Sequence, residues 1–249
     1  MGNLAKDSFI DTAGVSLDSH TPDTGPIWQF SDLSDSFRIS DSEVAAYCEL
    51  VGTGVAFVDV SPVNYTVSVT IDTANFSVLG QQAGVVARWQ TAPQQGYKAV
   101  VNYDGTNFQA KLYKSQISDV PPDTQLGSTS ANLSTGSGIL SFQVNGTAIG
   151  PIKWKGVQVV AKVTDSTYTT GDPGIHASFL TLSSVDFFDN FLVVGTGTIV
   201  APKPKRVKIR VFEHPRIRAH KNILYAMKWV PRNTPAVAQN TSRFFHLFP

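Results

Sequence analysis

Short runs in which apolar and polar residues alternate fill the first 195 positions of the chain. The runs are rich in Val, Ile, Thr, Tyr and Phe, and clusters of Gly, Pro, Asn, Asp and Ser separate them. Examples are AYCELV, VNYTVSVTI, AGVVARW, VQVVAKVTD, IHASFLTL and FDNFLVV. Alternation places every second side chain on one face, which is typical of half-buried strands. No helical periodicity of useful length occurs before residue 215, so we expect an all-β fold.

Two segments have the pattern of a β-hairpin. Asp104-Gly105 separates two alternating runs in YKAVVNYDGTNFQAKLYK, and Asn145-Gly146 does the same in ILSFQVNGTAIG. A two-residue type I′ turn needs a positive φ at both central residues, which favours these dipeptides. We therefore predict such turns at both places. The alternation also predicts shared faces in the first hairpin: Tyr97, Ala99, Val101 and Tyr103 on one strand, and Phe108, Ala110, Leu112 and Lys114 on the other.

The opening of the chain, DSFIDTAGVSLDSHTPDTGPIWQFS, resembles the start of concanavalin A-like (laminin G-like) jelly rolls. The matching positions are Asp7, Phe9, His20, Thr21, Pro22, Asp23, Gly25 and Trp28. GVVARW at 84–89, YKAVVNYDG at 97–105 and FDNFLV at 188–193 correspond to later elements, so the resemblance covers about residues 5–195. It implies that residues 1–195 form a two-sheet antiparallel jelly-roll sandwich whose first and last strands lie side by side.

Neighbouring first and last strands would bring together three carboxylates, those of Asp7, Asp186 and Asp189. Ca²⁺ prefers carboxylate oxygens, so one interpretation is a structural calcium ion at this point. The alternative is that these residues cap turns and strand ends, where Asp is favoured for backbone reasons.

Catalytic chemistry has little support in the sequence. Glycoside hydrolysis needs two carboxylates about 5–10 Å apart, and hydrolases on this kind of fold typically carry an E-x-D-x-E strand, which the sequence lacks. The five histidines show neither HxxxH nor HxH spacing, and Cys48 has no second cysteine as partner. Nucleophile motifs and phosphate loops are also missing from the sequence. We therefore predict a protein that is not an enzyme.

Sugar binding would use exposed aromatic rings as apolar platforms, with amides and charged groups orienting the hydroxyls. The candidate glycan-binding residues are Arg88, Trp89, Tyr97, Asn102, Tyr103, Tyr113 and Trp154. For each of them, packing in the core or between strands is the alternative. We assign Trp28 to the core because of its place in the jelly-roll motif.

The charge of the chain is divided unevenly. Residues 1–201 contain 9 Lys and Arg against 18 Asp and Glu, a net charge of −9. Residues 202–249 contain 11 Lys and Arg against Glu213 alone, a net charge of +10. Gly and Pro between positions 195 and 204 indicate an extended linker. We therefore predict that residues 196–249 form a linker and a basic, mostly extended C-terminal arm.

Three interpretations of the arm are open: it binds nucleic acid through Lys and Arg, it is a solvated extension, or it docks on another protein subunit. The many aromatic and aliphatic side chains argue against a solvated extension, and a basic arm complements an acidic body. Docking is therefore favoured over nucleic-acid binding. The candidate docking residues are Arg206, Lys208, Arg210, Phe212, Tyr225, Trp229, Phe244, Phe245 and Phe248.

The sequence shows neither a secretory signal nor the roughly 20 apolar residues of a membrane helix, and a single cysteine agrees with a reducing compartment. We expect synthesis in a host cytoplasm without a signal peptide, and no membrane partner. Similar jelly rolls are frequent among bacteriophage virion proteins, and the resemblance implies that context. The first hypothesis is a capsid decoration or auxiliary subunit, homo-oligomeric and bound to other virion subunits, whose outward jelly roll could touch a host glycan. The alternatives are a carbohydrate-binding module of a tail or receptor-binding protein and, third, a glycoside hydrolase or lyase.

Overall fold

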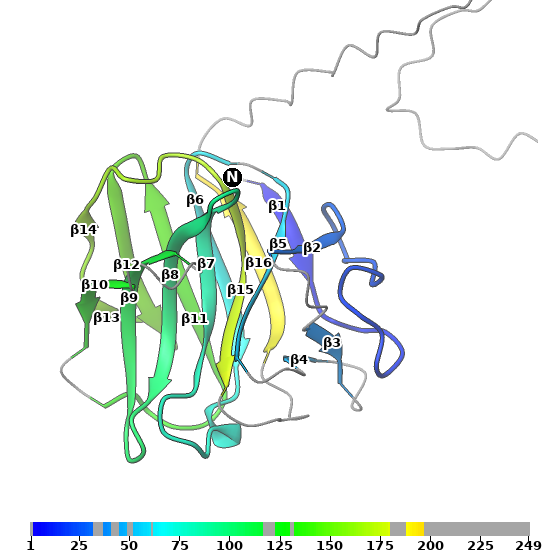
Figure 1. Ribbon diagram of the computed structural model, residues 1–249, viewed down its shortest axis with the longest axis horizontal. Coiled ribbons are helices and arrows are strands. Elements are labelled where there is room, and N and C mark those ends of the chain that lie inside the picture. The colour runs from blue at the N-terminus through cyan, green and yellow to red at the C-terminus, as the bar shows by residue number, and fades with distance from the viewer. Residues whose placement is uncertain are drawn as a thin grey trace, which may run out of the picture. The chain divides into compact units, whose positions relative to one another are not determined.

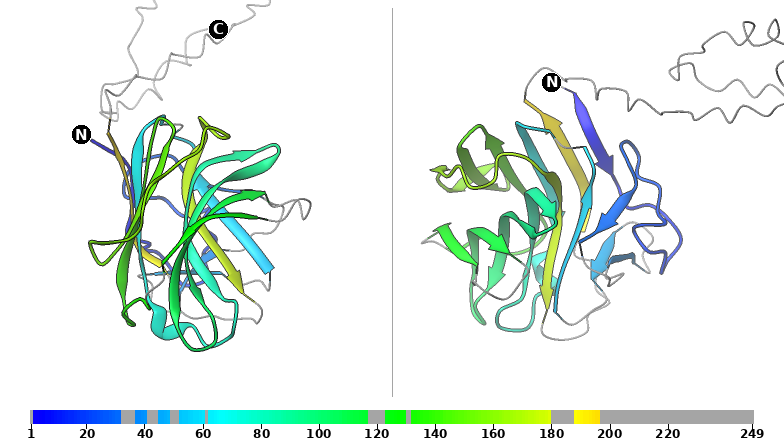
Figure 2. Two further views of the ribbon diagram at one scale, coloured as in Figure 1. Left: turned by 90° about the vertical axis from the view of Figure 1, so that its left-hand side faces the viewer. Right: turned by 45° about the horizontal axis from the view of Figure 1, so that its top comes forward.

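The computed structural model describes residues 2–31, 37–40, 45–48, 52–60, 62–116, 123–129, 132–179 and 188–196. Within these ranges the chain forms two antiparallel β-sheets that pack face to face (Figures 1 and 2). The helical structure in these ranges is one short 3-10 turn, η1 (Thr73–Asn75). No helix in the same ranges is long and apolar enough to cross a membrane. The predicted all-β sandwich is confirmed.

Sheet A is formed by β1 (Asn3–Asp7), β3 (Phe37–Ile39), β4 (Ala46–Cys48), β6 (Tyr65–Ile71), β11 (Gly138–Asn145), β12 (Ala148–Trp154), β13 (Val157–Val160), β14 (Val163–Thr164) and β16 (Phe188–Gly195). Among the described residues its strand order is β13-β12-β11-β6-β16-β4-β3, with β1 also paired to β16 and β14 to β12. Asp7 on β1 lies opposite Phe191 on β16. The first and last strands of the jelly roll are therefore neighbours, as the resemblance implied.

Sheet B is formed by β2 (Trp28–Phe30), β5 (Gly52–Val58), β7 (Gln82–Thr91), β8 (Gln94–Tyr103), β9 (Phe108–Gln116), β10 (Thr124–Ser128) and β15 (Asp172–Phe179). Its strand order in the described part of the chain is β10-β9-β8-β7-β15-β5-β2. This sheet faces the viewer in Figure 1, and the left view of Figure 2 shows the two layers edge-on.

Alternation along the strands selects the side chains that fill the space between the sheets. Every second residue of β6, starting from Tyr65, is buried. On β8 and β9 the predicted shared faces are confirmed, because Ala99 pairs with Leu112 and Val101 pairs with Ala110. All four side chains belong to the core, so these faces point inward. Burial of the larger apolar side chains contributes roughly 1.5–3 kcal/mol each before the entropy of ordering is subtracted.

The hairpin turn between β8 and β9 is shifted by one residue from its predicted position. The Asp104 amide donates to the Asn107 carbonyl at 3.0 Å, so the two central residues are Gly105 and Thr106. Of these four residues only Gly105 has a positive φ, of 92°. A type I′ turn at Asp104-Gly105 is therefore wrong.

The reason for the shift is the Asp104 side chain, which the pairing rule ignores. Its Oδ1 accepts hydrogen bonds from the amides of Thr106 and Asn107, at 3.0 and 2.7 Å. Asp commonly bonds the backbone two residues further on in this way. The turn between β11 and β12 is shifted likewise, since Asn145 pairs with Ala148 across the strands.

A buried carboxylate ties the N-terminal segment to the core. Asp7 is 1% exposed; its Oδ1 accepts from the Phe9 amide at 2.7 Å, and its Oδ2 accepts from Trp28 Nε1 at 2.6 Å. His20 lies between two carboxylates, with Nε2 2.9 Å from Asp7 Oδ1 and Nδ1 2.8 Å from Asp11 Oδ2. Phe9, His20 and Trp28 of the jelly-roll motif thus form one hydrogen-bonded unit around Asp7.

These contacts control the charge of His20. Burial acts to lower the pKa of His20, but the hydrogen bonds and negative charges of Asp7 and Asp11 outweigh it, so the pKa is raised. The hydrogen bond with His20 in turn lowers the pKa of Asp11. A protonated imidazole can donate from both ring nitrogens, one to each carboxylate.

A histidine whose pKa is raised on folding stabilises the protein fully below its unfolded pKa of about 6.5, and this contribution is lost as the pH rises through the folded pKa. We therefore expect the free energy of unfolding to fall as the pH rises above about 6.5. In His20→Gln this slope should disappear, because no titrating group faces Asp7 and Asp11. Denaturant unfolding of both proteins across this range checks the prediction. A slope equally steep in the variant would show that another group causes it.

Candidate functional site

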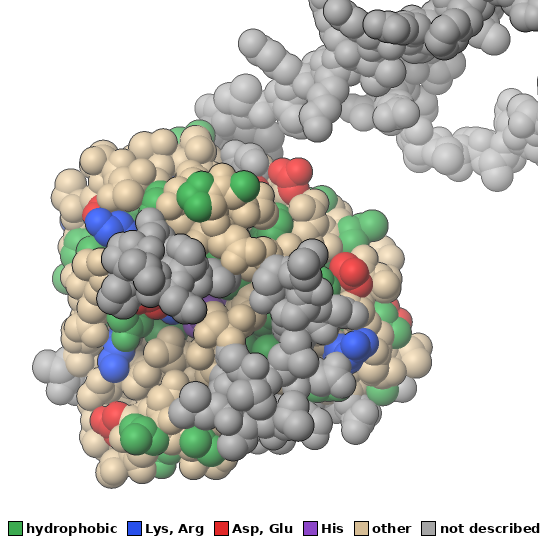
Figure 3. All heavy atoms as spheres, viewed as in Figure 1, with side chains coloured by type: hydrophobic (Ala, Val, Ile, Leu, Met, Phe, Trp, Pro, Cys, Tyr) green, Lys and Arg blue, Asp and Glu red, His purple; other side chains and the backbone are tan. Residues whose placement is uncertain are grey.

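The face of sheet B that points away from the core carries both apolar and polar side chains. The apolar ones form a second cluster, separate from the core: Val55, Phe57, Val86 and Trp89. Between and beside them lie polar residues of β8, β9 and β15. Figure 3 views this face and shows a histidine and charged side chains close together on it. The outer face of sheet B is therefore more than a solvated surface.

Five polar or aromatic residues meet on this face, and we call them the polar cluster: Lys98, Tyr113, Ser115, Asp123 and His176. Lys98 forms an ion pair with Asp123, and its Nζ lies 5.2 Å from the centre of the Tyr113 ring. Ser115 Oγ donates to Asp123 Oδ1 at 2.7 Å. The Lys98 side chain is only 8% exposed, whereas that of Asp123 is 28% exposed. The carboxylate thus lies at the surface with the ammonium group beneath it.

His176 differs from the other members of the polar cluster because its hydrogen-bonding groups are unused. The residue is 1% exposed, and neither ring nitrogen has a hydrogen-bond partner among the described residues. Burial, reinforced by the charge of Lys98, places the pKa of His176 well below its usual value. The Gly54 backbone has a weaker opposite effect, because it lies near the ring without meeting the geometry of a hydrogen bond. The ring is therefore neutral near pH 7, with one donor and one acceptor. Buried groups without a partner cost about 1–3 kcal/mol and call for an explanation.

Two glycines form the floor beside His176. Gly84 pairs with His176 across the strands, and Gly174 lies two residues before it on β15. A Cβ atom on Gly84 would lie 2.1 Å from the Ala99 carbonyl oxygen, and one on Gly174 would lie 2.1 Å from that of Ala56. No side chain fits at either position, so the surface next to His176 is backbone.

An open cavity of about 350 Å³ lies at one end of the same face, and we call it the end cavity. Its lining residues are Trp89, Gln90, Thr91, Ala92, Thr170, Gly171 and Asp172. The Gln90 amide joins two of its sides, since Nε2 donates to the Thr170 carbonyl at 3.3 Å and Oε1 accepts from Gln95 Nε2 at 2.7 Å. Trp89 and Asp172 are opposite each other on β7 and β15.

Three of the predicted glycan-binding residues lie on this face. Trp89 lines the end cavity, although it is almost fully buried. Tyr113 belongs to the polar cluster. Asn102 is buried further along β8, and its Oδ1 accepts from Gln82 Nε2 at 3.1 Å.

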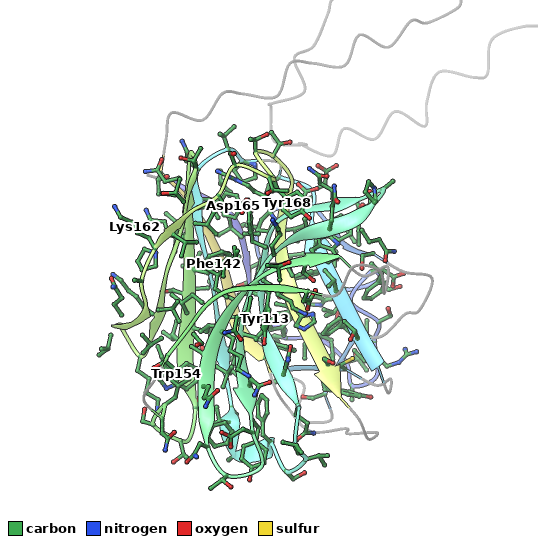
Figure 4. All side chains as sticks on the ribbon, turned by 60° about the vertical axis from the view of Figure 1, so that its left-hand side comes forward. Tyr113, Phe142, Trp154, Lys162, Asp165 and Tyr168 are labelled. Carbon is green, nitrogen blue, oxygen red and sulfur yellow. The ribbon has the colours of Figure 1, made fainter. Side chains whose placement is uncertain are left out.

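The other predicted glycan-binding residues face inward, because alternation turns them towards the core. Tyr97 is buried, its hydroxyl lies 2.5 Å from Asp165 Oδ1, and its pKa is raised by burial. Tyr103 stacks on Phe108 with 4.9 Å between ring centres. Trp154 is buried on sheet A (Figure 4). These three aromatic rings offer no platform on the outer face.

Arg88 is also structural rather than exposed. It is 1% exposed and has a positive φ of 52°. Its guanidinium donates to the carbonyls of Tyr168 and Val63 at 2.9 and 3.0 Å, and its amide donates to the Tyr65 hydroxyl at 2.6 Å. Arg88 thus closes one end of the sandwich.

Sequence reasoning missed four members of the polar cluster: Lys98, Ser115, Asp123 and His176. A usable signal existed at two of them, because Lys98 and His176 interrupt runs of apolar residues within strands. Asp123 follows two prolines, a setting in which Asp is favoured for backbone reasons, so its sequence gives no sign of a site.

The calcium interpretation is not supported by the placement of Asp7. Both of its oxygens already accept hydrogen bonds, from the Phe9 amide and the Trp28 indole, and His20 lies against Oδ1. Asp189 contacts the Asn190 side chain, and burial raises its pKa. Asp186 lies outside the described residues. No group of three or more His, Cys, Asp or Glu in the described part of the chain could hold a metal ion.

The predicted arm also lies outside the described residues, and with it every candidate docking residue. These are Arg206, Lys208, Arg210, Phe212, Tyr225, Trp229, Phe244, Phe245 and Phe248.

Comparisons with known proteins identify the architecture. No protein-family model and no curated protein matches the chain. The GH43 protein BlXynB of Bacillus licheniformis is 18% identical with a TM-score of 0.51, over 77% of this chain and 39% of that one. A GH43B protein of the Bacteroides ovatus xyloglucan PUL is 20% identical with a TM-score of 0.51, over 78% and 40%. The carbohydrate-binding module CBM66 of Bacillus subtilis is 14% identical with a TM-score of 0.48, over 68% and 92%.

The fold is a jelly-roll sandwich. The chain spans about two fifths of the length of the two GH43 proteins that it resembles. At these identities the likeness concerns the fold alone, and one fold carries many functions.

The unpartnered ring of His176 leads to a prediction about stability. Replacing a buried polar group that has no partner by an apolar one of similar size is close to neutral or stabilising. We expect His176→Leu to change the free energy of unfolding at pH 7 by less than about 1 kcal/mol, or to raise it. Denaturant unfolding measures this, and a larger loss would show that the imidazole has a partner.

The same variant tests the charge of the ring. A histidine whose pKa is lowered on folding stabilises the protein above about pH 6.5, and this contribution is lost as the pH falls towards the folded pKa. Between pH 6.5 and pH 5 we therefore expect the wild type to lose more stability than His176→Leu. This window lies below the one assigned to His20, so the two effects are separable.

Proposed function

We propose that the chain binds carbohydrate on the outer face of sheet B and does not hydrolyse it. The polar cluster carries this proposal. It places a partly exposed carboxylate and an aromatic ring next to a buried ammonium group and a neutral imidazole with free hydrogen-bonding groups. Sugars have apolar faces that pack on aromatic rings and hydroxyls that both donate and accept hydrogen bonds, so this mixture of groups suits them.

The proposal excludes hydrolysis for a chemical reason. Cleavage of a glycosidic bond uses two carboxyl groups, one of them a proton donor. The polar cluster contains a single carboxylate, Asp123, which the Lys98 ammonium holds in an ion pair. The jelly-roll fold is compatible with binding and with catalysis, so only the residues of the polar cluster distinguish between the two.

Binding is tested with the full chain on immobilised xylan, arabinan, mannan and levan. We expect retention by at least one of them, with Asp123→Asn and Tyr113→Ala each weakening binding roughly tenfold through loss of a charge-assisted hydrogen bond or an apolar platform. Asp104→Asn, a matched change at the opposite end of the β8–β9 hairpin, is the control. The proposal is refuted if none of the four polysaccharides retains the protein, or if the control variant loses as much binding as the two site variants.

A second candidate function follows from the charge asymmetry of the chain. A net charge of −9 over residues 1–201 and +10 over residues 202–249 suits an arm that docks on the acidic surface of another subunit. We propose for this arm a role in joining the protein to a virus particle as a decoration or auxiliary subunit. Carbohydrate binding and arm docking would occupy different parts of the chain.

Substitutions in the full chain test the arm. If apolar burial holds it, replacing Trp229 and Phe245 with Ala should reduce assembly more than replacing Lys203 and Lys205, because exposed charge pairs contribute little. Native mass spectrometry or incorporation into particles measures the effect. Stronger loss in the lysine variant, together with DNA binding that weakens steeply with salt, would favour nucleic-acid binding instead.

A further inference from the structure

The end cavity is separate from the polar cluster but lies on the same face of sheet B. Trp89 belongs both to its lining and to the apolar cluster of that face. Its indole Nε1 is buried and has no hydrogen-bond partner among the described residues. Like His176, it is a donor left without an acceptor, at a cost of about 1–3 kcal/mol. Two such groups on one sheet face suggest a shared cause.

A single glycine connects the end cavity to the polar cluster. Gly96 on β8 is paired with Ser115, a member of the polar cluster. A Cβ atom on Gly96 would lie 2.9 Å from the Trp89 ring, so the indole packs directly over this glycine. No side chain at position 96 separates the two sites. Asp172 and Gly174 are two residues apart on β15, which corresponds to about 7 Å along the strand. Gly174 lies opposite Val86 on β7, and Val86 lies opposite Lys98 on β8. The cavity is therefore about 7 Å along the sheet from the position of Lys98.

The floor of the end cavity is also shaped by backbone. Gly171 has a φ of 132°, and a Cβ atom there would lie 2.4 Å from the Arg88 carbonyl carbon. The chain before β15 is therefore held against β7, which fixes the position of Asp172 beside Trp89. A preorganised cavity loses less entropy on binding a ligand.

The charge of the lining restricts the ligand. Among the described residues that line the cavity, Asp172 is the one charged group, and the others are neutral polar or apolar. The polar cluster contains one cation and one anion, which are paired. Neither site offers an unpaired cation to a ligand carboxylate, whereas hydroxyl groups can donate to Asp172 and accept from the indole.

We propose that the end cavity is a second sugar subsite, so that the protein binds an uncharged oligosaccharide whose units reach from the polar cluster into this cavity. This inference rests on the proposed carbohydrate binding and specifies its ligand: neutral, and longer than one sugar ring. The Asp172 carboxylate orients the hydroxyls of the unit in the cavity, and Trp89 forms its apolar wall.

Calorimetric titration of the full chain tests chain length and charge. The probes are the monosaccharides and trisaccharides of D-xylose, L-arabinose, D-mannose and D-fructose, and trigalacturonic acid as a charged trisaccharide. For the sugar that binds, we expect the trisaccharide to bind at least about tenfold more tightly than its monosaccharide, and trigalacturonic acid to bind more weakly than the neutral trisaccharide.

Two variants test whether the tighter binding of the trisaccharide depends on the end cavity. Thr91→Trp places a large side chain on the exposed rim of the cavity, and Asp172→Asn removes its charge; each should abolish most of the tenfold gain. Thr106→Trp, an equal change on the exposed turn at the other end of β8, is the control. Matched melting temperatures confirm that the variants are folded.

The outcomes separate the two proposals. If the trisaccharide binds no more tightly than the monosaccharide, or if both cavity variants keep the gain, the second subsite is wrong, while loss of binding in Asp123→Asn still supports the polar cluster. Equal or tighter binding of trigalacturonic acid overturns the neutral ligand. A wild type that binds none of the sugars overturns the proposed function itself.

Discussion

The middle strands of sheet B are buried on both faces, and the packing of the two sheets depends on this burial. Seven consecutive residues of β7, from Ala83 to Trp89, are buried, so successive side chains that point in opposite directions are all removed from water. The inner set joins the core between the sheets. The outer set packs around Val86 and Trp89. Because side chains alternate strictly, each strand in the middle of the sheet contributes to the core and to the outer face at once.

Burial on the outer face makes its polar groups costly unless they serve a purpose. Lys98 forms an ion pair with Asp123, and Asn102 is bonded to Gln82. His176 and the Trp89 indole have no such partner. Unsatisfied groups of this kind are rare in stable proteins, and a site that exchanges them with a ligand is one reason for their retention.

The two buried histidines show how surroundings decide the role of one residue type. His20 lies between Asp7 and Asp11, which raise its pKa and engage both ring nitrogens, so it holds the N-terminal segment in place. His176 lies beside Lys98 without a carboxylate of its own, and its pKa falls. Both ring nitrogens of the first imidazole are engaged by the fold, whereas those of the second have no hydrogen-bond partner among the described residues.

Local pattern was enough to predict most of the long strands and the side chains of β8 and β9 that share a face, because alternation and turn residues act within a few positions. The pairing of the first and last strands was implied by the resemblance to jelly rolls and not by the pattern. It failed where a side chain competed with the backbone, as Asp104 does in its turn. It also failed to separate Tyr97, which is in the core, from Tyr113, which is on the outer face, as candidate sugar platforms.

Only the tertiary structure decided which distant residues meet. His176 lies beside Gly84 because of the β7–β15 register, and Asp123 reaches Lys98 across β9. Such pairings depend on strand order and register over long separations in the chain, which no local pattern contains.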